Sequence, residues 1–168
     1  MTELITLAAT TPGIDLTEKA LVFAGAFCAI AFSAIGSAWG TGAAAASAVG
    51  AWKKCYVQNK QAPFQLMIFS GAPLSQTIYG MILMFSIMGA DLSKPGVWAF
   101  YMITGILAGI AMGISAAWQG MAGAAACDAF AETGKGFANQ MVVLCIIETV
   151  AIFVMAFSMV LLSSFAAA

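Results

Sequence analysis

The sequence predicts an all-α membrane protein in which four transmembrane helices form two tandem helical hairpins. Of its 168 residues, 62% are apolar and 8% are charged, whereas a soluble domain carries about 25% charged residues. The mean hydropathy is +0.99. The charged residues divide the chain into four runs of about 30 residues, and ~20 apolar residues of helix cross a bilayer. The second half of the chain also resembles the first, so each half is expected to form one hairpin.

The positions of Asp, Glu and Lys define the four spans. The runs are 20–52, 61–90, 95–127 and 136–168, and an N-terminal segment, 1–16, precedes them. Because each run exceeds the ~20 residues that a bilayer requires, we expect the helices to extend into the headgroup region or beyond it.

The first hairpin, 17–90, begins with a helix rich in Ala and Gly and returns with a helix rich in Leu, Met and Phe. The segment 59–63, which starts with Asn and ends with Pro, interrupts the apolar pattern between them. The second hairpin, 91–168, repeats this order and carries the one charged residue within the runs. Turn-forming residues at 91–96 separate the hairpins, and those at 132–136 connect the two helices of the second.

The composition excludes several classes of function. Six Lys and no Arg stand against seven acidic residues, which gives a net charge of −1, so the chain has no basic surface for nucleic acid. Because the sequence contains no His, it has neither His-based catalysis nor His-ligated metals, and we predict no catalytic residue. The cysteines lie too far apart for a CxxC-type site and are expected to be free thiols: Cys28, Cys55, Cys127 and Cys145.

The lysines predict the orientation in the membrane. Four of them lie in or beside the two hairpin connections: Lys53, Lys54, Lys60 and Lys135. Lys19 and Lys94 lie on the other side. Cytoplasmic loops carry an excess of Lys and Arg, so we expect both hairpin loops in the cytoplasm and both termini on the opposite side.

The two halves of the chain are related by an internal duplication. A shift of 72 positions aligns Gln76-Thr77 with Glu148-Thr149, and Phe85-Ser86 with Phe157-Ser158. A shift of 80 positions likewise aligns glycines and alanines of the first and third spans. Both repeats cross the membrane in the same direction, unlike the inverted repeats of many secondary transporters.

Glycines at four-residue spacing are concentrated in the first and third spans. They are Gly36, Gly40, Gly105, Gly109 and Gly113. Ordinary helix packing accounts for any one of them, because this spacing lets backbones approach closely in lipid. Two such helices paired with two bulky ones nevertheless suggest a tightly packed inner wall and a thicker outer wall. A ring of hairpins has this form, and we assign the five glycines to ring packing.

Glu148 is the one ionisable carboxylate inside the four runs, and it lies near the middle of the fourth. An acidic residue at the centre of a membrane helix costs about 3 kcal/mol on insertion scales, so it predicts a functional site. The structural alternative is a protonated Glu that only hydrogen-bonds a neighbouring helix.

The second span presents a polar face at the same depth. Four residues spaced i, i+3, i+4 and i+7 share it: Ala72, Ser75, Gln76 and Tyr79. Pro73 cannot donate a backbone hydrogen bond and distorts the helix, so carbonyls just before it can turn outward as ligands. The third span adds Gln119.

These groups form a set of hard oxygen donors with a single negative charge. The set contains amide oxygens, a hydroxyl, a carbonyl and one carboxylate. Such a set suits a monovalent cation, because Ca²⁺ usually recruits more carboxylates and Zn²⁺ prefers nitrogen and sulfur.

At these residues the sequence resembles the proteolipid, or rotor-ring (K/c-type), subunit of V-type and A-type rotary ATPases, in the duplicated four-helix form. The resemblance covers essentially the whole chain past about Leu16. Its most specific parts are PLSQTIY at 73–79, Gln119-Gly120 and Ile147-Glu148-Thr149. In sodium-translocating members of this family, a carboxylate, two glutamines, a hydroxyl and a backbone carbonyl hold the ion, and a tyrosine donates to the carboxylate.

The resemblance assigns these roles to residues of this chain. It implies Na⁺ ligands at Ala72 (by its carbonyl), Ser75, Gln76, Gln119 and Glu148, with a supporting hydrogen bond from Tyr79. The family's usual hydroxyl residue is Thr, where this chain has Ser75. Li⁺ is expected to substitute for Na⁺, and H⁺ is expected to compete.

The resemblance also implies the partners. Identical copies would form a ring in membrane lipid, turning against a stator membrane subunit that bears an arginine, and central-stalk subunits would meet the cytoplasmic loops. Each Glu148 would carry an ion between two half-channels, which couples ion flow to rotation. ATP hydrolysis or synthesis would take place on other subunits, so the chain is not an enzyme by itself.

Three alternatives remain open. The same ring carrying H⁺ would need only Glu148 and a shielding neighbour, whereas the complete oxygen set favours Na⁺. A small four-helix drug/proton antiporter also uses one membrane Glu, but it predicts neither paired glutamines nor parallel duplication. A structural tetraspan protein would leave Glu148 without a role.

Overall fold

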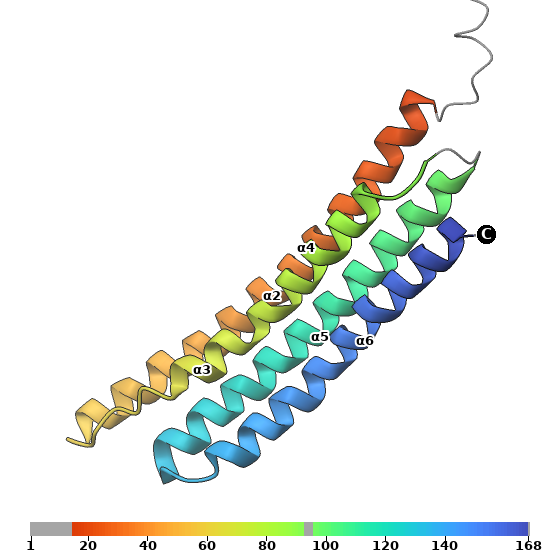
Figure 1. Cartoon of the computed structure of the whole chain (residues 1–168). Coiled ribbons are helices and arrows are strands. Elements are labelled where there is room, and N and C mark those ends of the chain that lie inside the picture. The colour runs from red at the N-terminus through yellow and green to blue at the C-terminus, as the bar shows by residue number, and fades with distance from the viewer. Residues whose placement is uncertain (1–14, 93–95, 168) are drawn as a thin grey trace, which may run out of the picture.

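The computed structural model describes residues 15–92 and 96–167, and within them all regular structure is helical (Figure 1). The elements are α2 (Leu16–Val57), α3 (Leu66–Gly71), the 3₁₀ turn η1 (Ala72–Leu74), α4 (Ser75–Met88), α5 (Val97–Thr133) and α6 (Phe137–Ala167). Because α3, η1 and α4 continue one another, the described chain has four spans long and apolar enough to cross a membrane. The predicted fold of four membrane helices is confirmed.

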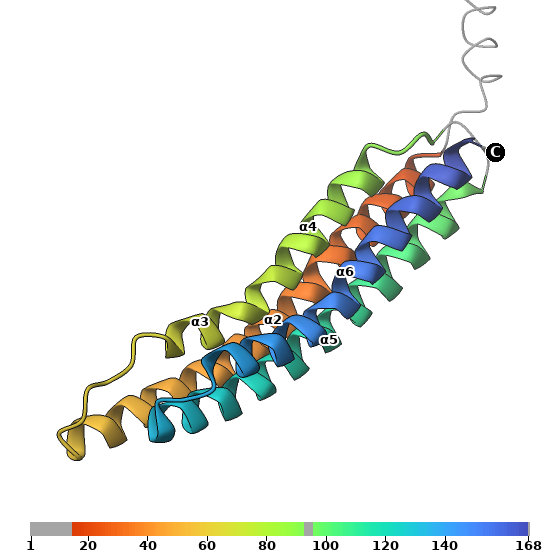
Figure 2. The same cartoon turned by 60° about the horizontal axis from the view of Figure 1, so that its bottom comes forward.

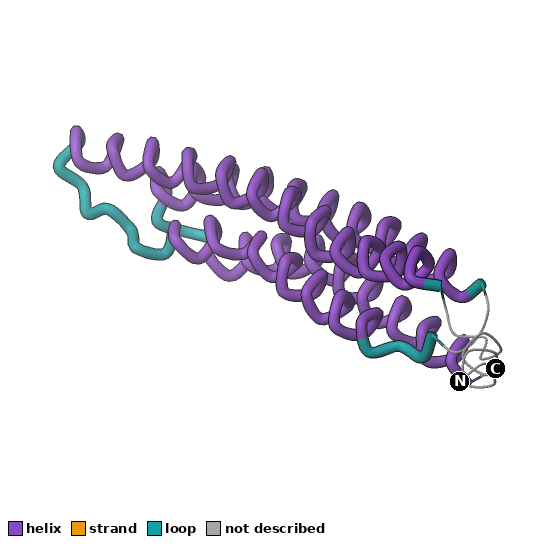
Figure 3. Tube along the Cα trace, turned by 90° about the horizontal axis from the view of Figure 1, so that it is seen from above, coloured by secondary structure: helices purple, strands orange, loops and turns teal. Residues whose placement is uncertain are grey.

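The four spans run side by side along the bundle (Figure 2), and the loops are confined to its two ends (Figure 3). The predicted boundary between the hairpins, at 90/91, falls in the connection between α4 and α5. Nearly all of the predicted N-terminal segment 1–16 lies outside the described residues, as do Lys94 and Pro95 of the middle connection.

The two hairpin connections have different geometries. In the first, residues 58–65, the Trp52 indole donates to the carbonyl of Pro63 at 2.8 Å. In the second, residues 134–136, Gly134 has a φ of 65°, a left-handed conformation that glycine adopts without strain. Its N–H closes α5 on the carbonyl of Phe130 at 2.8 Å. Residues 132 and 133, predicted to lie in this connection, therefore form the last turn of α5.

The glycines predicted to pack helices all lie between α2 and α5 of the same chain. At each of them an added Cβ would meet backbone atoms of the other helix: Gly36 meets Gly113, Gly40 meets Ala116, Gly105 meets Gly25, Gly109 meets Cys28 and Ala29, and Gly113 meets Phe32. The two backbones are thus in direct contact along much of their length, as small residues allow in lipid. This close contact is internal to one chain, and a role of these glycines between copies stays a prediction.

Adding one methyl group to this contact should destabilise the chain. A Cβ at Gly109 would lie 2.5 Å from the Cys28 carbonyl oxygen and 3.0 Å from the Ala29 Cα, and neither atom can rotate away. We expect Gly109→Ala to cost about 1–3 kcal/mol, the usual range for overpacking. Gly42→Ala is the matched control, because nothing lies within 4 Å of a Cβ there. Thermal loss of helicity in detergent measures both, and equal losses would contradict the contact.

The helices α4 and α6 present large apolar side chains to the outside. On α6 one stripe is formed by Ile146, Val150, Phe153 and Phe157, each at least half exposed. In the apolar stretch of α6 only 17% of residues are buried, against 33% to 39% in the other three spans. This surface suits contact with lipid or with another copy of the chain.

An exposed ion-pair cluster joins the hairpins near their connections. Lys54 on α2 lies 2.8 Å from Asp128 and 3.5 Å from Glu132, both on α5. All three side chains are more than half exposed, so solvent screens these pairs and they contribute little to stability. Helix α2 has 42 residues, about 63 Å at 1.5 Å per residue, which leaves ample helix outside a hydrocarbon core of ~30 Å for such charges. The four cysteines are free thiols, as predicted.

Candidate ion-binding site

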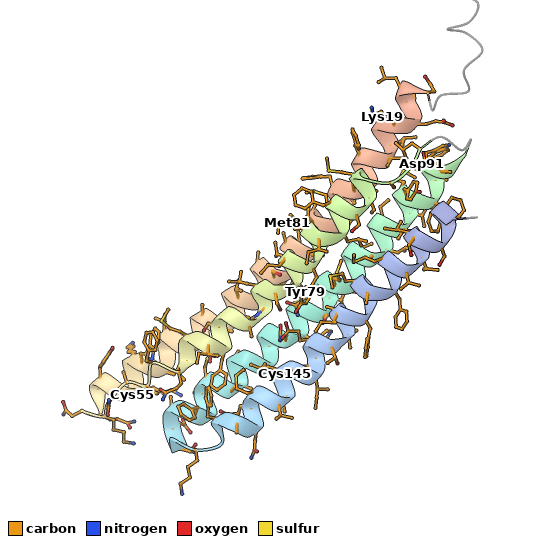
Figure 4. The ribbon with its side chains drawn as sticks, in the orientation of Figure 1. Lys19, Cys55, Tyr79, Met81, Asp91 and Cys145 are labelled. Atoms are coloured by element: carbon orange, nitrogen blue, oxygen red, sulfur yellow. The ribbon has the colours of Figure 1, made fainter. Side chains whose placement is uncertain are left out.

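Glu148 is held by hydrogen bonds from two other helices. Its Oε1 accepts from the Tyr79 hydroxyl at 2.6 Å, and its Oε2 lies 3.4 Å from the Gln119 amide nitrogen. Tyr79 lies about midway along the bundle (Figure 4). The side chain of Glu148 is only partly buried within the chain, because α6 lies at the surface of the bundle. The carboxyl therefore faces inward from a helix whose other face is open.

Two glutamines form the buried centre of the site. The Gln76 amide nitrogen donates to the Gln119 amide oxygen at 2.8 Å, and both side chains are 0% exposed. The Gln119 amide nitrogen also donates to the carbonyl of Leu144 at 3.0 Å. These bonds turn the Gln119 nitrogen toward α6 and its oxygen toward α4. Burying two amides inside a membrane helix bundle is costly unless they are bonded in this way.

Pro73 lies in the short 3₁₀ turn η1, which contains Ala72 and directly precedes Ser75. Since proline has no N–H, the carbonyl of Phe69 loses its usual helical partner, and it packs instead against Gly123 of α5. Directly after η1, the Ser75 hydroxyl donates to the carbonyl of Ala72 at 3.0 Å and lies 3.2 Å from the Gln76 amide oxygen. The helix distortion predicted at Pro73 thus coincides with η1.

The polar residues predicted from sequence meet in one hydrogen-bonded chain. It runs from Ser75 through Gln76 and Gln119 to Glu148, with Tyr79 on the far side of the carboxyl. The oxygens along it are a backbone carbonyl, a hydroxyl, two amide oxygens and a carboxylate, which are hard donors. Within 15–92 and 96–167, no group of three or more His, Cys, Asp or Glu is placed to hold a metal ion. Glu148 is thus the single carboxyl in this hydrogen-bonded chain, and its other oxygen donors are neutral.

One polar residue beside the site was not predicted from the sequence. The Ser115 hydroxyl, on α5, donates to the carbonyl of Ile147 at 2.9 Å, directly before Glu148. The sequence does contain one indication of this role. Ser115 lies four residues before Gln119, so both side chains are on the same face of α5.

A family model for the ATP synthase C-subunit matches residues 24–87 and 102–161, which together make up more than half of the chain. The same model matches once in each hairpin, which confirms the predicted internal duplication. A comparison with curated proteins found no match.

Proposed function

The chain belongs to the ATP synthase C-subunit family, and we propose that it is a rotor-ring subunit of a V-type or A-type ATPase that carries Na⁺ on Glu148. Members of this family form oligomeric rings that translocate ions and perform no ATP chemistry themselves. The chain is accordingly an integral, multi-pass membrane protein. The match also argues against the drug/proton antiporter alternative.

The buried glutamine pair is the observation that carries the sodium assignment. A proton on Glu148 would need no further oxygen ligands, yet Gln76 and Gln119 are fully buried and connected to it. Their amide oxygens, with Ser75 and the Ala72 carbonyl, supply the neutral ligands that a small monovalent cation requires. Li⁺ would fit the same donors, and H⁺ would compete for the carboxylate.

Neutralisation of Glu148 explains how a ring could carry the ion past lipid. A bare carboxylate in hydrocarbon is costly, whereas an occupied or protonated one is tolerated. Release of the ion from Glu148 requires a positive charge near the carboxylate, which an arginine supplies in the family that the sequence resembles. Because this chain contains no arginine, we assign that residue to a stator membrane subunit.

The V-type or A-type assignment rests on the number of carboxylates. Gln76 stands in the first repeat where Glu148 stands in the second, which leaves one ion for every four helices. A ring with fewer ions per turn suits ATP-driven pumping against a steep gradient. The lysines near both hairpin connections support a cytoplasmic position for these loops, where central-stalk subunits would bind.

Labelling with dicyclohexylcarbodiimide tests the proposal. The reagent modifies protonated carboxyls in apolar surroundings, so we expect it to label Glu148 and to spare the exposed Asp128 and Glu132. Added Na⁺ should slow the labelling, because an occupied carboxylate is not protonated. Peptide mass spectrometry identifies the labelled residue. Labelling of Asp128 or Glu132, or a rate at Glu148 that Na⁺ does not change, would contradict the sodium site.

A further inference from the structure

Helix α6, which carries Glu148, is held loosely by apolar packing within its own chain. Only 17% of the residues in its apolar stretch are buried, about half the share in the other spans. Apolar contacts are non-directional, so they do little to fix the rotation of such a helix about its axis. The direction in which Glu148 points must therefore depend strongly on directional bonds.

Two side chains of α5 supply such bonds to the backbone of α6. The Ser115 hydroxyl donates to the carbonyl of Ile147 at 2.9 Å, and the Gln119 amide donates to the carbonyl of Leu144 at 3.0 Å. Both donors lie on one face of α5, and both acceptors lie in the turn of α6 that ends at Glu148. The turn is thus attached to α5 at both of its ends.

Both donor side chains are buried, so water does not compete for these two hydrogen bonds. Ser115 is 6% exposed and Gln119 is 0% exposed. Without its acceptor on α6, the Gln119 amide would lose a partner, which is costly in an apolar medium, and the Ser115 hydroxyl could turn only to a carbonyl of its own helix.

The bond from Ser115 does not disturb helix α6. The carbonyl of Ile147 has a second lone pair, so it can accept from Ser115 and keep its own helical bond.

We propose that Ser115 is a positioning residue that fixes the rotation of α6, so that the Glu148 carboxyl faces Tyr79 and Gln119. The inference rests on the proposed function only in taking Glu148 as the ion carrier. Gln119 combines the roles of ligand and anchor. Ser115 is therefore the position at which the anchor can be removed without touching the oxygen set.

The rate at which dicyclohexylcarbodiimide labels Glu148, measured in the purified oligomer without Na⁺, tests this role for any transported ion. Ser115→Ala should accelerate labelling about threefold to tenfold, the equivalent of one lost hydrogen bond. Ser115→Thr keeps the hydroxyl and should restore the parent rate. Ser33→Ala is the matched control. Ser33 is also buried, at 0% exposed, but its hydroxyl donates to the Ala29 carbonyl of its own helix at 2.7 Å, so the parent rate is expected.

A parent rate in Ser115→Ala, or an equal acceleration in Ser33→Ala, would overturn the proposal. If Ser115→Ala does not assemble, Ser115→Cys keeps the size of the side chain and weakens its donor. A faster rate in that variant supports the anchor, and a parent rate overturns it. A second arm adds Na⁺ to the parent. Unchanged labelling there would count against the sodium assignment while leaving the comparison of Ser115 variants valid.

Discussion

Glu148→Gln is expected to abolish ion uptake while leaving the oligomer assembled. The substitution keeps the volume of the side chain. It also keeps an oxygen that can accept the hydrogen bond that Tyr79 donates to Glu148 at 2.6 Å in the parent. It removes the one negative charge of the site. A unit charge about 4 Å from a cation contributes about 4 kcal/mol at an effective dielectric constant of 20, which corresponds to about a thousandfold in affinity.

ATP-driven uptake into vesicles that contain the whole complex measures this loss, and gel electrophoresis in mild detergent measures assembly. The matched control is Glu132→Gln, which removes an exposed acid of α5 near the hairpin connection and should leave uptake near the parent level. Uptake at the parent rate in Glu148→Gln would contradict the proposed carrier.

Gln119→Ala should weaken Na⁺ binding by about 1–3 kcal/mol, which corresponds to a factor of about 5 to about 150 in affinity. Gln119 is fully buried and supplies a neutral oxygen at the centre of the hydrogen-bonded chain. Na⁺ needs this ligand, whereas a proton on Glu148 does not. The same reasoning predicts a similar loss for Gln76→Ala.

The concentration of Na⁺ that halves the labelling rate of Glu148 by dicyclohexylcarbodiimide gives the apparent affinity. Gln61→Ala removes an exposed glutamine of the first connection and serves as the control. An unchanged half-protecting concentration in Gln119→Ala would identify the glutamines as packing residues.

The positions of the spans follow from the sequence because a bilayer leaves few alternatives. Only helices and closed barrels satisfy every backbone group in hydrocarbon, so long uncharged runs with small-residue spacing indicate helices. The partners of the glycines do not follow in the same way. Gly36 and Gly113 have the spacing of a close helix contact, but this spacing does not distinguish a helix of the same chain from one of a neighbouring copy. The structure places the contact inside the chain.

The polar face of the second span is likewise a property of helical periodicity, which alone puts Ser75, Gln76 and Tyr79 on one side. The contact of this face with Glu148 depends on how α4, α5 and α6 pack together. Helical periodicity carries no information about that packing. Ser115 was missed for a further reason. Serines inside helices often bond a carbonyl of their own helix, as Ser33 does, and the sequence does not reveal which of them reach across to another.

Equilibrium binding of radioactive Na⁺ to the purified oligomer tests the central claim most directly. We expect a single Na⁺ bound per chain at neutral pH, lost as the pH falls because H⁺ competes for the Glu148 carboxylate. We also expect no binding in Glu148→Gln. Absence of Na⁺ binding to the parent at millimolar concentrations and neutral pH would contradict the sodium assignment, and the ring would then carry protons.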